Sequence, residues 1–414
     1  MTAEILTIGD ELLIGQVINT NQAHIARELN GIGIPVARMS TVGDDMAVLL
    51  EAFADAWRRH EVVIVTGGLG PTHDDITKKA VCTFFNTDLV SNADVRASIG
   101  QFLSNRGMVW SRAAEDQTFV PRTASVMPNP VGTAPGLLFE DKQRIFVVLP
   151  GVPHEMQEIV HQSLIPYLST KVKDSFITHL TLRTTGIAES LLASRLGDLD
   201  EILHGVTLAF LPSPRGVRLR ISARSRTREQ ADQLVHAAET RIRAKVEKYI
   251  YATGDEELEE VIGRILTERK LTLSVAESCT GGLLAHTITN VSGSSRYFER
   301  GVVAYSNRSK IELLHIAPEI VAAHGAVSKQ VAEAMAVGVR ETTGTNIGLS
   351  TTGIAGPTGG GPEKPVGLVW IGYADAKGSV ALKFQFGNQR LLIKERTAQA
   401  ALELLRRKLL GLAA

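Results

Sequence analysis

The chain lacks the features of membrane proteins and of disulfide-rich secreted proteins. No uncharged apolar run approaches the roughly 18–20 residues that span a bilayer, so we expect no membrane segment. The beginning of the chain carries no basic segment of the secretory type, so we expect no signal peptide. Only two cysteines occur, Cys82 and Cys279. Their wide separation argues against a disulfide framework and favours a cytoplasmic location, where thiols stay reduced.

The chain also lacks a charge bias. Lys plus Arg and Asp plus Glu both number 44, so the formal net charge is zero. Bulk electrostatics therefore favours neither nucleic acid nor an anionic membrane as a partner. The densest basic cluster fits the solvated face of a small sheet, and it consists of Arg215, Arg218, Arg220, Arg224, Arg226 and Arg228.

The first 172 residues have the pattern of an α/β domain. Short apolar runs at residues 5–8, 62–65 and 145–149 predict strands that are covered on both faces, as in a parallel sheet. Residues 21–29 carry apolar side chains on one helical face, and glycines follow them. At 414 residues, two or three domains are expected.

Two further domains are predicted from a change of pattern. Residues 177–252 alternate apolar with polar side chains and fit a small α+β domain of β-α-β-β-α-β order. Residues 255–414 return to α/β, with a boundary near Gly254. The strands predicted there are 271–275, 347–351, 368–373 and 380–386, and the helices are 329–341 and 393–410.

Three polar loops follow predicted strands of the first domain, where ligands bind open α/β sheets. The glycine-rich loop of residues 66–77 can cradle phosphates with backbone N–H groups, although no Lys-Ser/Thr pair follows as in a Walker A loop. Asp10, Asp74 and Asp75 offer the hard oxygens that Mg²⁺ prefers. Capping aspartates and turn glycines are the alternative interpretation.

A hydroxyl, a thiol and a second hydroxyl lie together at a predicted strand-to-helix turn in the third domain. The turn reads SCTGG, residues 278–282, before a helix that starts near Leu283. It presents unpaired N–H groups and the positive end of a helix dipole, and its glycines let a ligand approach the main chain. This environment suits a nucleophile whose transition state carries an oxyanion, while a simple helix cap is the alternative.

The N-terminal motifs resemble those of the competence-damage-inducible protein A (CinA) family. The matching segments are GDELLIGQ (9–16), NTN (19–21), TGGLGPT (66–72) with Asp74 and Asp75, NPVGTAPG (129–136) and LPGVP (149–153). The resemblance implies a domain similar to molybdopterin-binding domains, which in some members cleaves ADP-ribose into AMP and ribose 5-phosphate. It implies a divalent metal (Mg²⁺, Mn²⁺ or Co²⁺) at Asp10, Asp74 and Asp75. The substrate-binding residues would be Asn21, Gly67, Gly68, Gly70 and Thr72.

The C-terminal motifs are similar to the same family's nicotinamide-nucleotide amidase domain, which hydrolyses nicotinamide mononucleotide (NMN) to nicotinate mononucleotide and ammonia. They are SCTGG (278–282), GVVAYSNRSK (301–310), HGAVS (324–328), STTGIAGP (350–357) and KPVG (364–367). The family also implies a middle domain of KH type and a homodimer. Because the middle segment has no Gly-x-x-Gly loop, RNA binding through it is not expected.

Amide hydrolysis needs a nucleophile, a base and donors for the oxyanion. Ser278 is the predicted nucleophile and Cys279 its rival, while Lys310 is the predicted base, which requires a lowered pKa. Tyr305 and Thr352 would relay a proton or position the substrate. Predicted substrate-binding residues are Thr280, Gly281, Gly282, Gly353 and, for the phosphate, Arg390. The histidines of this domain lack ligand spacing, so we expect no metal or other cofactor there.

The sequence therefore predicts a three-domain enzyme of pyridine-nucleotide recycling that acts on NMN and on ADP-ribose. Two alternatives remain. One is a nucleotide-binding protein linked to competence or DNA damage, and the other is a molybdopterin-binding enzyme in the first domain.

Overall fold

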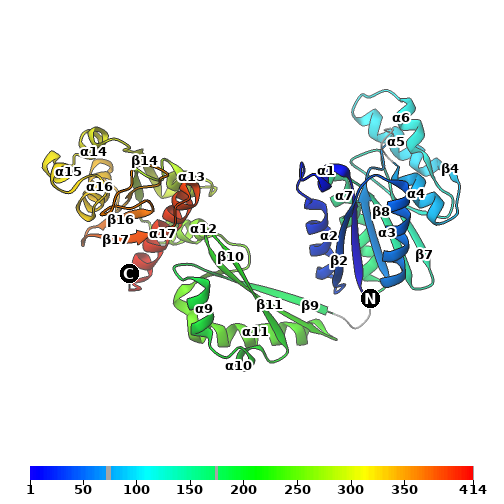
Figure 1. The fold of residues 1–414 in the computed structure, drawn as a ribbon, viewed down its shortest axis with the longest axis horizontal. Coiled ribbons are helices and arrows are strands. Elements are labelled where there is room, and N and C mark those ends of the chain that lie inside the picture. Colours follow the sequence, from blue (N-terminus) through cyan, green and yellow to red (C-terminus); the bar gives the residue numbers. More distant parts are fainter. Residues whose placement is uncertain (71–75, 173–175, 414) are drawn as a thin grey trace. The chain divides into compact units, whose positions relative to one another are not determined.

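The computed structural model describes residues 1–70, 76–172 and 176–413 (Figure 1). The chain forms two compact units, Met1–Thr178 with Arg224–Asp232, and His179–Ala223 with Gln233–Ala414. Within the described ranges, no helix combines the length and the apolar character needed to cross a membrane.

The first unit is built on a six-stranded sheet. Its strands, in spatial order, are β2 (Val36–Val42), β1 (Ala3–Ile8), β3 (Val62–Gly67), β8 (Arg144–Pro150), β7 (Gly136–Asp141) and β6 (Ser125–Met127). The first four strands run parallel, and β7 and β6 are antiparallel to their neighbours. The runs predicted at 5–8, 62–65 and 145–149 are the buried centres of β1, β3 and β8.

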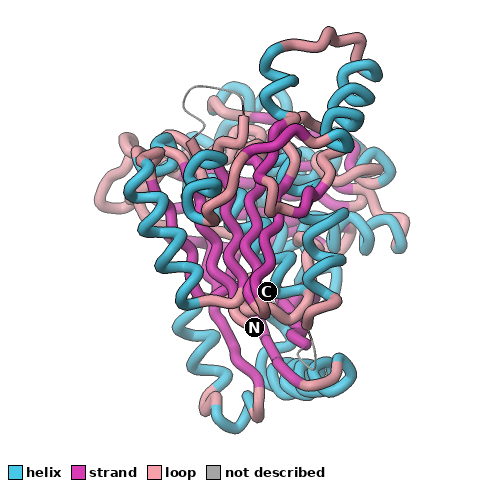
Figure 2. The backbone as a smooth tube through the Cα atoms, turned by 90° about the vertical axis from the view of Figure 1, so that its right-hand side faces the viewer, coloured by secondary structure: helices cyan, strands magenta, loops and turns pink. Residues whose placement is uncertain are grey.

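Helices cover both faces of this sheet, which gives three layers. On one face α2 (Thr20–Gly31) and α7 (Pro153–Ile159) pack their apolar side chains against the strands. On the other face lie α3 (Met46–Arg59), α4 (Thr77–Phe84) and α5 (Ala93–Asn105). Figure 2 shows these strands side by side with helices flanking them. The remaining elements are α1 (Asp10–Leu13), β4 (Leu89–Ser91), α6 (Arg112–Gln117), β5 (Phe119–Pro121), the π-helix Val160–Leu164 and α8 (Ile165–Ser169).

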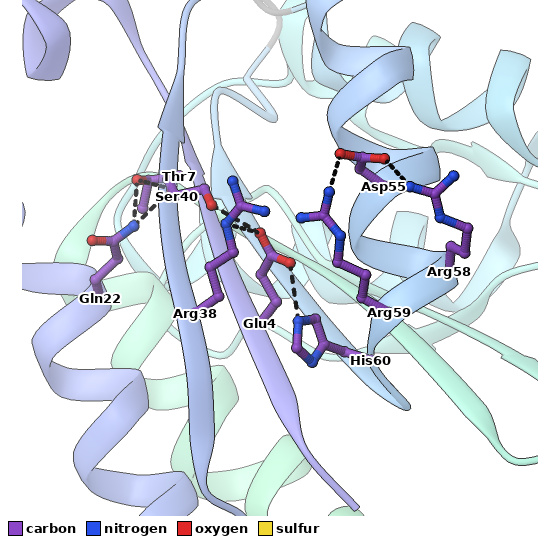
Figure 3. Close-up of polar contacts among 9 residues, drawn as sticks. All are labelled: Glu4, Thr7, Gln22, Arg38, Ser40, Asp55, Arg58, Arg59 and His60. Atoms are coloured by element: carbon purple, nitrogen blue, oxygen red, sulfur yellow. Dashed lines mark hydrogen bonds and ion pairs between the residues drawn. The ribbon is translucent and has the colours of Figure 1, made fainter.

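Polar contacts between β1, β2 and α2 hold the start of the sheet (Figure 3). The buried Glu4 carboxylate accepts a hydrogen bond from Ser40 Oγ at 2.8 Å and lies 3.4 Å from His60 Nε2. Gln22 Nε2 donates to Thr7 Oγ1 at 3.0 Å and to the Ser40 carbonyl at 2.8 Å. These bonds fix α2 against the carboxyl half of β1, where the first polar loop begins.

The middle segment has the predicted β-α-β-β-α-β order. Its elements are β9 (Phe176–Thr184), α9 (Glu189–Leu196), α10 (Asp200–Leu203), β10 (Val206–Ser213), β11 (Gly216–Ser225), α11 (Arg228–Val246), the 3-10 turn Glu247–Tyr249 and β12 (Ile250–Thr253). The sheet order is β10-β11-β9-β12. On β11, Val217, Leu219 and Ile221 are buried, whereas Arg218 and Arg220 are exposed, as the alternating pattern predicts.

The C-terminal segment is a five-stranded mixed sheet between helices. The strand order is β14 (Phe298–Val303), β13 (Leu273–Glu277), β15 (Ile347–Gly353), β16 (Leu368–Asp375) and β17 (Gly378–Gln385). One face packs against α12 (Leu258–Glu268), α13 (Leu283–Thr289) and α17 (Arg390–Leu410). The other face packs against α14 (Asn307–Leu314), α15 (Pro318–His324) and α16 (Lys329–Thr343), and a 3-10 turn covers Ser294–Arg296.

Candidate active sites

The C-terminal candidate site lies where the sheet changes its winding direction. Strand β13 pairs in parallel with β14 on one side and with β15 on the other, so their carboxyl ends share one edge. Helix α13 follows β13 on one face, and α14 to α16 follow β14 on the other. Ser278 comes directly after β13 and therefore occupies the point where ligands bind in open α/β sheets.

Ser278 contacts a buried lysine. Lys310 lies on α14, is 1% exposed, and places its Nζ 3.1 Å from Ser278 Oγ. The same amine donates to the carbonyls of Ala304 at 2.8 Å and Tyr305 at 3.3 Å. Burial lowers the pKa of Lys310 to about 8, because the charged form loses its hydration.

Three acceptors surround Lys310 Nζ: the carbonyls of Ala304 and Tyr305 and the hydroxyl of Ser278. The charged amine donates one N–H group to each of them, and loss of one proton leaves two N–H bonds and a lone pair. In that neutral form the two carbonyls keep their N–H donors, and the lone pair can accept the proton of the Ser278 hydroxyl. The pair can therefore pass a proton from Ser278 to Lys310.

A buried carboxylate holds the turn that carries Ser278. Glu277, the last residue of β13, is fully buried, and its two oxygens accept backbone N–H groups from Gly282 (2.9 Å), Leu284 (3.1 Å) and Ala285 (2.8 Å). These groups form the N-terminus of α13, whose positive dipole end favours the negative charge. Glu277 therefore supplies the negative charge at that helix end.

The neighbouring thiol has a different environment. Cys279 is 6% exposed and packs in the hydrophobic core beside Leu284. Burial raises its pKa to about 12, so the thiolate is a negligible fraction at neutral pH. In contrast to Ser278, Cys279 behaves here as a small buried apolar residue.

The other predicted residues of this site line the same edge with separate partners. Thr352 is buried at the end of β15 and donates to the Ala326 carbonyl at 2.8 Å, away from Ser278. Tyr305 is exposed, and Arg390 Nη2 donates to its hydroxyl at 3.2 Å. Arg390 Nη1 donates to the carbonyl of Gly356 at 2.7 Å.

The glycines of the turn adopt a backbone that other residues rarely adopt. Gly281 and Gly282 have φ values of 59° and 93°. Thr280 Oγ1 lies 2.7 Å from Thr351 Oγ1 and ties the turn to β15, while Gly353 ends that strand. In the part of the chain that the structure describes, no acceptor faces the Gly281 N–H, which leaves it for a ligand oxygen.

The N-terminal candidate site is also a strand-end edge. The carboxyl ends of β1, β3 and β8 lie side by side, with Gly67 opposite Pro150. Asn21 Nδ2 bridges them by donating to the Gly151 carbonyl at 2.8 Å and to Thr66 Oγ1 at 3.3 Å. Gly67 admits no side chain, since a Cβ would lie 2.7 Å from that of Ile8.

Only part of the predicted metal set can be placed. Asp10 begins α1 and is exposed; its Oδ1 accepts the Asp44 N–H at 3.3 Å, and the Asp10 N–H donates to Asp44 Oδ2 at 3.2 Å. Thr72, Asp74 and Asp75 lie outside the described residues, whereas Gly68 and Gly70 lie just before them. Across residues 1–70, 76–172 and 176–413 no group of three His, Cys, Asp or Glu side chains could hold a metal ion.

Comparison with known proteins finds three family models that match successive parts of the chain. The family models that match are "Probable molybdopterin binding domain" over residues 4–170, "Damage-inducible protein CinA KH domain" over 179–252 and "CinA C-terminal domain" over 255–409. A CinA-like protein of Kosmotoga olearia is 42% identical over the full length of both chains. This chain belongs to the CinA family.

Other CinA relatives show similar identities. A putative competence-damage inducible protein of Caldicellulosiruptor bescii is 43% identical, covering 99% of this chain and 100% of its own. The crystal structure of the competence/damage inducible protein CihA of Agrobacterium tumefaciens is 39% identical, covers 37% of this chain and 95% of that one, and has a TM-score of 0.35. The fold class of the three segments agrees with these family models.

Sequence reasoning missed two residues of the C-terminal CinA site. Glu277 was not singled out, although it is the only charged residue between the apolar run and the glycines. Thr351, rather than Thr352, contacts the turn through its hydroxyl, and its carbonyl accepts the Ser278 N–H at 2.9 Å. The signal for Glu277 was local, because a carboxylate before an unsatisfied helix N-terminus predicts capping. The contact of Thr351 joins residues 71 positions apart, so no local pattern indicated it.

Proposed function

We propose that the C-terminal domain hydrolyses the carboxamide of NMN, with Ser278 as nucleophile and Lys310 as base. The observation that carries this proposal is the 3.1 Å contact between Lys310 Nζ and Ser278 Oγ in a buried environment. A serine beside a neutral amine is a sufficient nucleophile–base pair for acyl transfer. Ammonia is the leaving group, so the reaction needs water and no redox partner.

The steps follow from the contacts. Ser278 Oγ attacks the carboxamide carbon while its proton moves to Lys310 Nζ. The carbonyl oxygen becomes an oxyanion, for which the Gly281 N–H is a donor. Collapse breaks the C–N bond, and Lys310 returns the proton to the departing ammonia. Water then attacks the ester on Ser278, and Lys310 takes and returns a proton again.

Binding of the nucleotide phosphate is assigned to Arg390. Its two Nη atoms already orient the guanidinium through Gly356 and Tyr305. Lys394, one helical turn further along α17, adds a second cation, whose Nζ lies 3.6 Å from where a Cβ on Gly281 would be. Both cations therefore lie on the side of the turn where a substrate phosphate can be held.

The test is product identification from NMN with chelator present. The proposal predicts equimolar ammonia and nicotinate mononucleotide, measured by an ammonia assay and mass spectrometry. The absence of ammonia release from the wild-type protein, with the fold intact by circular dichroism, would overturn the proposal.

For the N-terminal domain we propose metal-dependent cleavage of ADP-ribose to AMP and ribose 5-phosphate. The supporting observation is the meeting of Asp10, Asn21 and Gly67 at one strand-end edge, where ligands bind in open α/β sheets. The donor set fits Mg²⁺, which binds through one or two carboxylates and substrate phosphates. Asp10 would hold the ion together with Asp74 and Asp75, and the ion would neutralise charge on the pyrophosphate.

The matched experiment uses ADP-ribose with Mg²⁺, Mn²⁺ or Co²⁺. AMP formation is expected to be lost in Asp75→Ala and retained in Asp141→Ala, which removes an exposed carboxylate at the end of β7, beside the first residue of β8 and not at the strand-end edge. Unchanged turnover in Asp75→Ala would refute this metal site. Mass spectrometry of co-purified ligand separates ADP-ribose from a molybdopterin, and a filter-binding assay at physiological salt tests nucleic acid.

A further inference from the structure

A second cavity lies in the second unit, separate from the Ser278 edge. Its volume is about 600 Å³, within the range of small-ligand sites. It is enclosed by β17, by α17 and by two turns of the middle segment, residues 185–189 and 212–217. None of the residues assigned above to NMN or ADP-ribose lines it. We propose that this cavity binds a small planar aromatic anion.

The floor of the cavity is a flat apolar surface. Leu382, Phe384 and Phe386 alternate along β17 and its end, so their side chains share one face. The rings of Phe384 and Phe386 are stacked, with centroids 5.6 Å apart and planes at 15°. Nearly parallel rings offer an aromatic face on which another planar ring can stack.

One wall is a single stripe of helix α17. The stripe recurs every three to four residues, which places its members on one helix face. It consists of Arg396, Gln399, Ala400, Glu403, Leu404 and Arg407. Gln399 Nε2 donates to Thr185 Oγ1 at 3.3 Å, and so fixes the middle segment against this wall.

The charges that face the cavity leave one cation unpaired. Glu403 pairs with Arg406 at 2.7 Å and with Arg407 at 2.6 Å. Arg215 lies 3.1 Å from Glu259 and 3.9 Å from both Glu257 and Glu395. Arg396 has no ion pair among the described residues, and Glu189 is an exposed acid that also lines the cavity.

The ligand class follows from this combination. Arg396 can pair with a carboxylate, sulfonate or phosphate, and the phenylalanine floor accepts the ring. A second copy of this chain or an extended peptide fits less well, because the cavity has the volume of one small molecule. The proposal does not depend on the deamidation proposed above.

The test is a fluorescence titration with naphthalene-2-sulfonate, a planar aromatic anion, on the full-length protein. Arg396→Glu is expected to weaken binding about tenfold or more, as loss of a charge-assisted contact implies. Ala400→Trp fills the cavity and is expected to abolish binding. Lys383→Ala is the matched control, because Lys383 alternates with the floor residues on β17 and is exposed.

Thermal melting checks that each variant folds. Arg396 is exposed, so Arg396→Glu remains informative even if Ala400→Trp does not fold. A competition experiment then distinguishes two classes of ligand. Displacement of the fluorescent probe by AMP indicates a nucleotide, and displacement by nicotinate indicates a free aromatic acid. Wild-type titration curves in Arg396→Glu, or displacement by neither competitor, would overturn the proposal.

Discussion

The two strand-end sites use the same position in an α/β sheet but are completed differently. At the C-terminal edge, the reactive side chains contact each other: Lys310 touches Ser278, and Glu277 satisfies the helix N-terminus beside them. At the N-terminal edge, Asp10 is exposed and its carboxylate accepts a backbone N–H of the facing loop. We propose that the first site needs only its substrate, whereas the second needs an ion.

This difference shows where a fold shifts pKa values. Lys310 loses its hydration because α14 buries it against the end of β14, and its pKa falls to about 8. Asp10, in contrast, is exposed at the start of α1. Burial thus lowers the pKa of Lys310 toward that of a base, whereas exposure leaves the Asp10 carboxylate accessible to an ion.

The largest expected effect comes from removing the buried amine. Lys310→Met should lower kcat/KM for NMN by about 10²–10⁴-fold, the usual contribution of general acid–base catalysis. ADP-ribose cleavage should not change. Lys329→Met, an exposed lysine at the start of α16, is the control and should match the wild type. Equal loss of both activities would mean that the variant damages the fold and that the two sites are not independent.

The next largest effect is expected from removing divalent metal, which should affect one activity and not the other. With EDTA, AMP formation from ADP-ribose should fall by about 100-fold or more, because the proposed ion neutralises the pyrophosphate. Ammonia release from NMN should stay within about twofold, since Ser278 and Lys310 contact each other directly. Assays of both products before and after adding back Mg²⁺, Mn²⁺ or Co²⁺ check this. A metal requirement for ammonia release would contradict the comparison.

A smaller effect is expected from the carboxylate behind the turn. Glu277→Gln replaces an acceptor-only group with one that carries an NH₂, so at least one of three N–H groups loses its partner. We expect kcat for NMN to fall about tenfold through misplacement of Ser278, and stability to fall by about 1–3 kcal/mol. The same change at Glu333, which accepts the Ala381 N–H away from the site, is the control. Denaturant unfolding and steady-state kinetics measure the two effects. An unchanged kcat in Glu277→Gln would contradict the role of Glu277 in positioning Ser278.

The lowered pKa of Lys310 predicts a pH dependence of activity and of stability. kcat/KM for NMN should rise with pH through about 8, as the amine becomes neutral. Between about 8 and the ordinary value of 10.5 the unfolded chain binds more protons than the folded one, so stability rises with pH there. Relative to Lys310→Met, the wild type should gain about 3 kcal/mol across that range. Urea titrations of both proteins at several pH values measure this gain. A difference in the free energy of unfolding that stays constant with pH would show that the pKa of Lys310 is not lowered.

The architecture was predictable because apolar runs mark buried strands. The cores of β1, β3, β8, β15 and β16 coincide with the predicted runs. The run predicted at 271–275 is shifted: β13 begins at Leu273, since Leu271 N–H still bonds the Leu266 carbonyl after α12. The strand continues through Glu277 because this residue pairs with Val303 of β14 and with Thr351 of β15. Edge strand β14 was missed, since only Phe298, Val302 and Val303 supply bulky apolar side chains there.

The candidate site was predictable only in part. Motif residues such as Ser278 and Lys310 could be named from the sequence, but their contact depends on the pairing of β13 with β14 and on the placement of α14. Whether Ser278 or Cys279 faces Lys310 depends on the turn geometry, which the residue types do not set. The hydrogen bond from Arg390 to Tyr305 joins residues that lie 85 positions apart, so no local sequence pattern indicates it.

The most direct measurement compares ammonia release from NMN in Ser278→Ala and Cys279→Ala. Lys310 touches the Ser278 hydroxyl, while the Cys279 thiol is buried with its pKa raised to about 12. We therefore expect Ser278→Ala to show no ammonia release above the protein-free rate, and Cys279→Ala to retain most of the wild-type kcat. Ammonia release that survives in Ser278→Ala and is lost in Cys279→Ala would contradict the assignment of Ser278 as the nucleophile.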